Sequence, residues 1–104
     1  MALQKVKQMR AKIIHVLVVD DDPHIITMLE RLLSKNDLQE FKILGAGLLG
    51  DALTLLNDNS FDVILLDLDL PDSKGIDTFH RVNSEVSDIP IIIISGVADE
   101  ELAF

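Results

Sequence analysis

Aliphatic runs alternate along this 104-residue chain with segments whose apolar residues recur at helical spacing. Four such runs, bounded by turn residues, predict β-strands that are covered on both faces. These runs are residues 13–19, 41–44, 63–66 and 91–94. Apolar residues three and four positions apart predict helices that begin near Asp22-Pro23, near Leu49 and within residues 73–75. Alternating strands and helices predict right-handed crossovers and a parallel sheet, and therefore an α/β fold.

Length and composition fit one small globular domain, which we expect to span residues 13–104. Hydrophobic residues make up 48% of the chain, and the absence of cysteine excludes disulfides and thiolate metal sites. The net charge of −9 argues against direct binding of nucleic acid or an anionic membrane. Residues 1–12 are basic and are interpreted as a solvated N-terminal tail. The apolar run that follows ends in three aspartates without a cleavage site, which predicts a cytoplasmic protein rather than a secreted one.

Polar side chains follow three of the four predicted strands. Asp20 and Asp21 follow the first strand, Asp67 the third and Ser95 the fourth. Open α/β sheets keep their ligand sites at the carboxyl ends of the strands. If the first and third strands are neighbours, their aspartates lie about 5 Å apart and repel by about 3 kcal/mol at an effective dielectric constant near 20. We therefore expect a bound proton or a divalent cation, and oxygen ligands favour Mg²⁺ or Mn²⁺.

This cluster predicts phosphoryl chemistry. A metal ion with open positions can bind a phosphate oxygen, and Asp67 could then attack the phosphorus to form an aspartyl phosphate. Ser95 could donate a hydrogen bond to a phosphoryl oxygen. Asp22 is instead expected to cap the first helix, and Asp69 is expected to face the metal only through its backbone carbonyl.

Three motifs, taken together, resemble the response-regulator receiver family of two-component signalling. They are VLVVDDDP, LLDLDLP followed by Lys74-Gly75, and IPIIIISG. The resemblance implies a flavodoxin-like sheet with strand order 2-1-3-4-5. It also implies a signalling module that is not an enzyme on a diffusible substrate. Such a module takes a phosphoryl group from a histidine kinase or a histidine phosphotransfer protein and then switches its interaction with a partner or an output domain.

The resemblance also assigns a role to each matching residue. Asp67 matches the phosphoacceptor, and Asp20 and Asp21 match the acidic pair, with Asp21 the more direct Mg²⁺ ligand. Asp69 matches the position that lends its backbone carbonyl to the metal, and Ser95 matches the switch hydroxyl.

The chain departs from the family pattern in two respects. Lys74 stands where an aspartate is common, and we interpret it as a solvated loop residue. The family's fifth strand, last helix and phosphoryl-contacting lysine have no counterpart, so the expected strand order is 2-1-3-4 in a C-terminally incomplete domain. The missing elements would cover the strand at 91–94 and part of the first helix. We therefore expect exposed apolar surface, with either self-association or a longer parent chain.

Two other functions remain open at this point. Gly45, Gly47 and Gly50 form a G-x-G-x-x-G pattern within a predicted turn and helix start, as in dinucleotide-binding Rossmann-like domains, although the nearby aspartates would repel a pyrophosphate. The D-x-D of Asp67 and Asp69 resembles that of haloacid-dehalogenase-like phosphatases, but the length leaves no room for a lid domain. The three histidines show no metal-ligand spacing.

Overall fold

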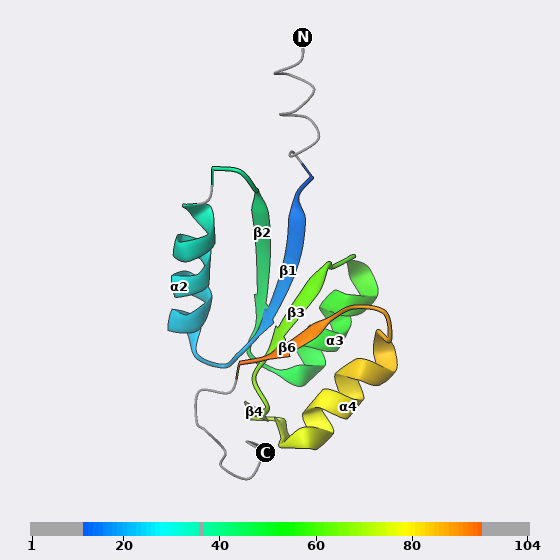
Figure 1. Ribbon diagram of the computed structural model, residues 1–104. Coiled ribbons are helices and arrows are strands. Elements are labelled where there is room, and N and C mark those ends of the chain that lie inside the picture. The colour runs from blue at the N-terminus through cyan, green and yellow to red at the C-terminus, as the bar shows by residue number, and fades with distance from the viewer. Residues whose placement is uncertain (1–11, 36, 95–104) are drawn as a thin grey trace.

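The computed structural model describes residues 12–35 and 37–94. Four strands form one parallel sheet: β1 (Ile14–Val19), β2 (Phe41–Ala46), β3 (Val63–Leu66) and β6 (Ile91–Ile93). Their order across the sheet is β2-β1-β3-β6 (Figure 1). This order confirms the predicted flavodoxin-like α/β fold.

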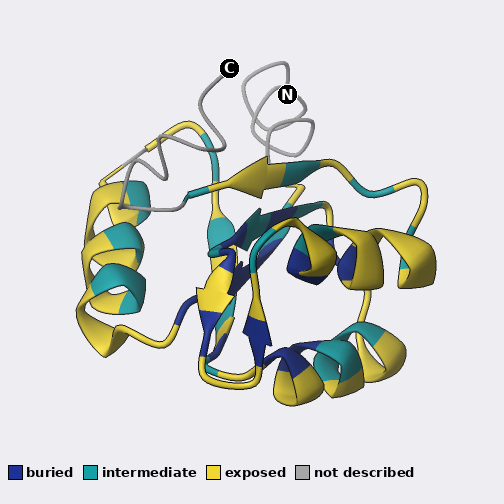
Figure 2. Ribbon diagram, turned by 90° about the horizontal axis from the view of Figure 1, so that it is seen from below, coloured by how far each residue is buried: buried dark blue, intermediate teal, exposed yellow. Residues whose placement is uncertain are grey.

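Helices cover both faces of the sheet. They are α2 (Pro23–Ser34), α3 (Leu49–Asp58) and α4 (Ile76–Glu85). The helix α2 lies on one face, and α3 and α4 lie together on the other (Figures 1 and 2). None of the helices among the described residues is long and apolar enough to cross a membrane.

The core lies between the sheet and the pair α3 and α4. Alternate residues of a strand point to the same face, so Leu17 and Val19 of β1 join Ile64 and Leu66 of β3 on this side. Leu49 and Ala52 of α3 and Val82 of α4 close the cluster from the helix side. The strand residues are almost fully buried (Figure 2). This burial fixes the sheet register and therefore the position of every residue that follows a strand.

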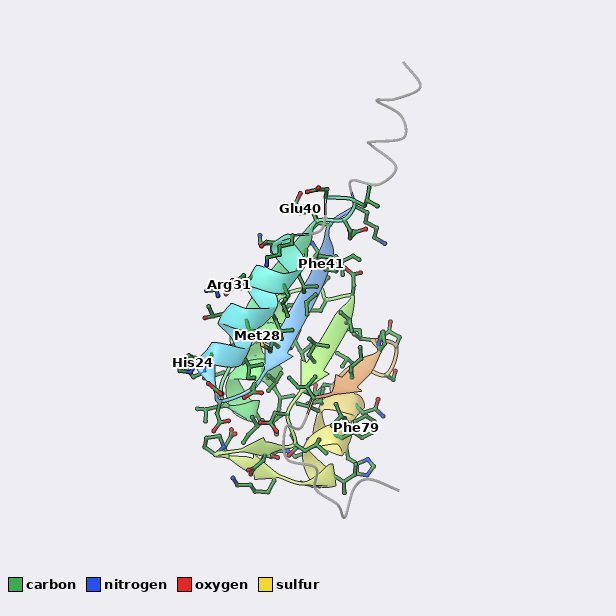
Figure 3. The ribbon with its side chains drawn as sticks, turned by 60° about the vertical axis from the view of Figure 1, so that its left-hand side comes forward. His24, Met28, Arg31, Glu40, Phe41 and Phe79 are labelled. Atoms are coloured by element: carbon green, nitrogen blue, oxygen red, sulfur yellow. The ribbon has the colours of Figure 1, made fainter. Side chains whose placement is uncertain are left out.

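The face under α2 is covered less completely. This helix has no buried residue, and Leu32, which the helical pattern places inward, is 55% exposed. Met28 is also exposed on this helix (Figure 3). Ile92 and Ile93 of the edge strand β6 are about half exposed. The predicted apolar exposure on these two elements is confirmed, and self-association remains a prediction.

The predicted turn at 45–47 is wrong for its first two residues. Gly45 and Ala46 continue β2 and pair with Val18 and Val19 of β1. A Cβ atom on Gly45 would lie 2.4 Å from Cδ1 of Ile26 on α2. The glycine at this position therefore permits close packing of α2 on the strand, and the chain turns only afterwards.

The loop between β3 and α4 is more ordered than the turn residues predicted. It contains two short antiparallel strands, β4 (Asp69–Leu70) and β5 (Ser73–Lys74). Leu70 and Ser73 are buried, and the Ser73 hydroxyl lies 2.6 Å from the Thr78 hydroxyl of α4. Alternating polar and apolar residues over so short a stretch give a weak strand signal.

Gly75 joins this hairpin to α4 with a positive φ of 72°. A Cβ atom at Gly75 would contact nothing within 4 Å, so a side chain there meets only backbone strain. Gly50, in the first turn of α3, has room for a Cβ atom at 3.7 Å from an Asp72 oxygen and has no positive φ.

These two glycines predict stability changes of opposite sign. Gly75→Ala should lower the free energy of unfolding by about 2 kcal/mol, because a φ of 72° with a ψ of −160° is a backbone conformation that essentially only glycine adopts. Gly50→Ala should raise it by about 0.5 kcal/mol, because alanine is the better helix former. Urea denaturation measures both changes. Equal effects in the two variants would show that the backbone at Gly75 is not the source of strain.

Candidate functional site

Three aspartates meet at the carboxyl end of the sheet. Asp20 and Asp21 follow β1, and Asp67 follows β3. Each offers one carboxylate oxygen, and these oxygens all lie within 4.8 Å of one another. Backbone hydrogen bonds hold the two loops in register: the Asp20 amide donates to Ala46 O at 2.9 Å, and the Asp67 amide donates to Val19 O at 2.8 Å. The sheet therefore brings the three carboxylates together, as their positions after the strands predict.

Asp20 is the buried member of this cluster and is 7% exposed. Its Oδ1 accepts a hydrogen bond from the Asp22 amide at 2.8 Å. Burial raises the pKa of the Asp20 carboxyl, and the nearby charges of Asp67, Asp21 and Asp22 raise it further, while the Asp22 amide acts in the opposite direction. The ionised form of Asp20 is thus costly to this site unless positive charge is brought in.

Asp67 is partly buried and its carboxylate is oriented by the backbone. Its Oδ1 accepts a hydrogen bond from the Asp69 amide at 3.0 Å. The Asp69 side chain is not in the carboxylate cluster. It is exposed and forms an ion pair of 2.6 Å between its Oδ1 and the Lys74 ammonium. A metal-facing role for the Asp69 backbone carbonyl stays a prediction, and Lys74 is ion-paired rather than merely solvated as expected.

Asp22 caps α2, as its place before Pro23 predicts. Its Oδ1 accepts a hydrogen bond from the His24 amide at 2.9 Å and lies 3.1 Å from the His24 ring Nδ1. Figure 3 shows His24 at the first turn of α2, where its side chain is 94% exposed. Neither residue belongs to the carboxylate cluster.

Asp72 has a structural role that sequence reasoning missed. It lies in the hairpin turn and caps α3 from a distance: Leu49 N donates to its Oδ1 at 2.8 Å, and Gly50 N donates to its Oδ2 at 3.0 Å. These two hydrogen bonds lower the pKa of the Asp72 carboxyl. One feature of the sequence could have indicated this role. Leu48 precedes α3 and has no side-chain acceptor, so the first amides of the helix need an acceptor from another segment.

The cluster has the donor set of a site for a hard cation. All three side chains offer carboxylate oxygens, and their exposure runs from buried Asp20 through partly buried Asp67 to exposed Asp21. Such a partly open set of oxygens suits Mg²⁺ or Mn²⁺, which retain water or phosphate ligands. Ser95, the predicted switch hydroxyl, lies outside the described residues.

The fold is a flavodoxin-like α/β domain with three carboxylates at the carboxyl ends of its strands. Comparison with known proteins identifies the family. The sequence profile of the response regulator receiver domain matches residues 16–104. The chain belongs to the response regulator receiver family, whose members are signalling modules.

Individual relatives agree with this family. The two-component response regulator ARR11 of Arabidopsis thaliana is 34% identical over 84 residues, covering 79% of this chain and 15% of that protein. A protein-glutamate methylesterase/protein-glutamine glutaminase of Clostridium acetobutylicum is 34% identical over 92 residues. The match covers 88% of this chain and 26% of that protein. The structure of the MaeR response regulator bound to beryllium trifluoride matches with a TM-score of 0.73 at 26% identity, covering 86% of this chain and 73% of that one. The chain therefore spans about a quarter or less of these two curated relatives.

The buried carboxylate predicts that Asp20→Asn stabilises the metal-free protein. Removing one charge from the cluster should raise the free energy of unfolding by about 1 kcal/mol at neutral pH, because like charges in such proximity repel. Asparagine keeps the oxygen that accepts the Asp22 amide. Urea denaturation with a chelator present measures the gain, and Asp88→Asn, in the loop after α4, controls for net charge.

The gain should also depend on pH. The folded state binds a proton at Asp20 more tightly than the unfolded state, because the folded pKa is raised. As the pH falls from neutral through the raised pKa, Asp20 of the folded wild type takes up a proton. The difference in the free energy of unfolding between Asp20→Asn and wild type should therefore shrink. A variant that is less stable than wild type at neutral pH would contradict this account of the cluster.

Proposed function

We propose that Asp67 accepts a phosphoryl group in a reaction that depends on Mg²⁺ or Mn²⁺. The observation that carries this proposal is the convergence of the Asp20, Asp21 and Asp67 carboxylate oxygens within 4.8 Å. Asp20 and Asp21, with the backbone carbonyl of Asp69, would hold the cation together with Asp67. The cation would neutralise the negative charge that the phosphoryl group brings to an acidic edge.

In the proposed step, a carboxylate oxygen of Asp67 attacks the phosphorus of a phosphohistidine. The new O–P bond forms as the P–N bond breaks, and the imidazole nitrogen leaves with the bonding electrons and takes a proton. The Asp69 amide donates to Asp67 Oδ1 and so orients the attacking carboxylate. The donor would be a histidine kinase or a histidine phosphotransfer protein, as in two-component signalling.

The switch would follow from the new charge on Asp67. By its place in the family motif, the Ser95 hydroxyl would donate to a phosphoryl oxygen, and the surface beyond β6 would change its interaction with a partner or output domain. The proposed location is the cytoplasm, where the kinases of such systems present their phosphohistidines. The relatives carry this kind of domain within much longer proteins, so the output can differ between them.

Neither alternative function gains support. At the start of α3, the Leu49 and Gly50 amides that would bind a pyrophosphate already donate to the Asp72 carboxylate. A phosphatase of the D-x-D type needs its second aspartate beside the first, whereas the Asp69 side chain lies outside the carboxylate cluster and pairs with the Lys74 ammonium. The receiver function is therefore the better proposal for the acidic edge.

Phosphorylation by a small donor tests the role of Asp67. Incubation with acetyl phosphate or phosphoramidate and Mg²⁺ should add the mass of one phosphoryl group, read by intact mass spectrometry. Asp67→Asn should lose this gain entirely, since the amide is not a nucleophile, and a chelator should abolish it in wild type. Asp88→Asn serves as the matched control and should be labelled like wild type. An equal gain in Asp67→Asn and wild type would refute the assignment.

Exposed apolar surface on α2 and β6 predicts self-association of the 104-residue chain. Light scattering should show a mass above that of the monomer, and it should fall towards the monomer on dilution. Ile92→Lys places a charge on the edge strand and should shift the protein towards the monomer. A wild-type chain that remains monomeric at high concentration would contradict this prediction.

A further inference from the structure

A lysine, Lys74, lies in the hairpin that follows Asp67 of the carboxylate cluster. In the hairpin after β3, Asp69 of β4 lies directly opposite Lys74 of β5. Their side chains form an ion pair of 2.6 Å, although both are mostly exposed. Opposite residues of an antiparallel pair are neighbours on the same face, so the backbone places the Lys74 side chain within reach of this carboxylate.

This ion pair is close to the proposed phosphoacceptor. Asp69 is two residues from Asp67 and donates its amide to Asp67 Oδ1. The Lys74 ammonium also lies within the field of the cluster: its pKa is raised by the hydrogen bond to Asp69 and, further, by the charges of Asp69, Asp21 and Asp67. The ammonium of Lys74 is thus paired with the residue whose backbone amide contacts the Asp67 carboxylate.

We propose that Lys74 is a specificity-determining residue that sets the charge balance of the site. Its ammonium offsets the Asp69 carboxylate, which favours the approach of an anionic phosphoryl donor and disfavours Mg²⁺. The proposal rests on the proposed function of Asp67 for its phosphoryl half, while its Mg²⁺ half requires only that the carboxylate cluster binds the cation. A structural residue would affect both ligands in the same direction, whereas a fixed charge affects them in opposite directions.

A charge series at this pair tests the proposal. Lys74→Gln removes the positive charge, Lys74→Arg keeps it, and Asp69→Asn removes the negative charge but keeps the backbone carbonyl. Lys42→Gln is the matched control, because Lys42 is an exposed residue near the start of β2, at the other end of the sheet. Calorimetry measures the dissociation constant of Mg²⁺ for each variant of the 104-residue chain, and intact mass spectrometry measures the KM for acetyl phosphate.

The expected shifts follow from the sign of each charge. Lys74→Gln should lower the Mg²⁺ dissociation constant and raise the KM for acetyl phosphate, each by about two- to fivefold for an exposed charge. Asp69→Asn should change both constants in the reverse directions, and Lys74→Arg should stay near wild type. The shifts should shrink in 1 M salt, where the screening length falls from about 10 Å at 0.1 M to about 3 Å.

The Mg²⁺ measurement decides the proposal even if no phosphoryl transfer is detected. If the Mg²⁺ dissociation constant in Lys74→Gln rises, or moves no further than in Lys42→Gln, the proposal is overturned. The proposal is also overturned if acetyl phosphate phosphorylates Lys74→Gln with a KM no higher than that of wild type. Loss of labelling in every variant, with the Mg²⁺ shifts intact, would instead refute the proposed function of Asp67 and leave the charge balance at Lys74 supported.

Discussion

The electrostatic repulsion among three carboxylates is the constraint on which the rest of this site depends. Two unit charges separated by 4.8 Å repel by about 3 kcal/mol at an effective dielectric constant near 20. Backbone hydrogen bonds fix the Cα positions at the ends of β1 and β3, so the carboxylates can separate only by rotation of their side chains. Burial of the aliphatic side chains in the sheet, each contributing about 1.5–3 kcal/mol, sustains this arrangement. The hydrophobic core therefore holds together charges that would otherwise move apart.

The protein relieves this repulsion in three ways that its own residues provide. The Asp22 amide donates a hydrogen bond to the Asp20 carboxylate, and the Asp69 amide donates one to the Asp67 carboxylate. The raised pKa of Asp20 makes a proton the readiest neutralising partner when no metal ion is bound. The Lys74 ammonium supplies a positive charge at the rim. These contacts leave a cluster of three carboxylates whose oxygens form a donor set that suits a divalent cation.

The sheet and the carboxylate cluster could be predicted from the sequence, because both follow from strongly patterned features. Aliphatic runs such as Val63–Leu66 identify buried strands, and the position of Asp67 after one of them fixes the edge on which it lies. The remaining details depend on contacts between distant segments. The strand character of Gly45 follows from its pairing with β1 and from Ile26 on α2, and neither is visible in the local sequence. The hairpin pairing of Asp69 with Lys74 was missed for the same reason.

The start of α3 and the carboxylate cluster differ in the kind of ligand that their groups suit. At the start of α3, the free amides that attract anions are satisfied by Asp72, a carboxylate of the same chain. Gly47, in the adjoining loop, packs against the backbone of Asp21, so this amide cluster and the acidic cluster are neighbours. A pyrophosphate at α3 would have to displace Asp72 and approach the aspartates directly. The carboxylate cluster offers oxygen ligands that suit a cation, so the same negative charge that disfavours a pyrophosphate at this edge favours a divalent ion.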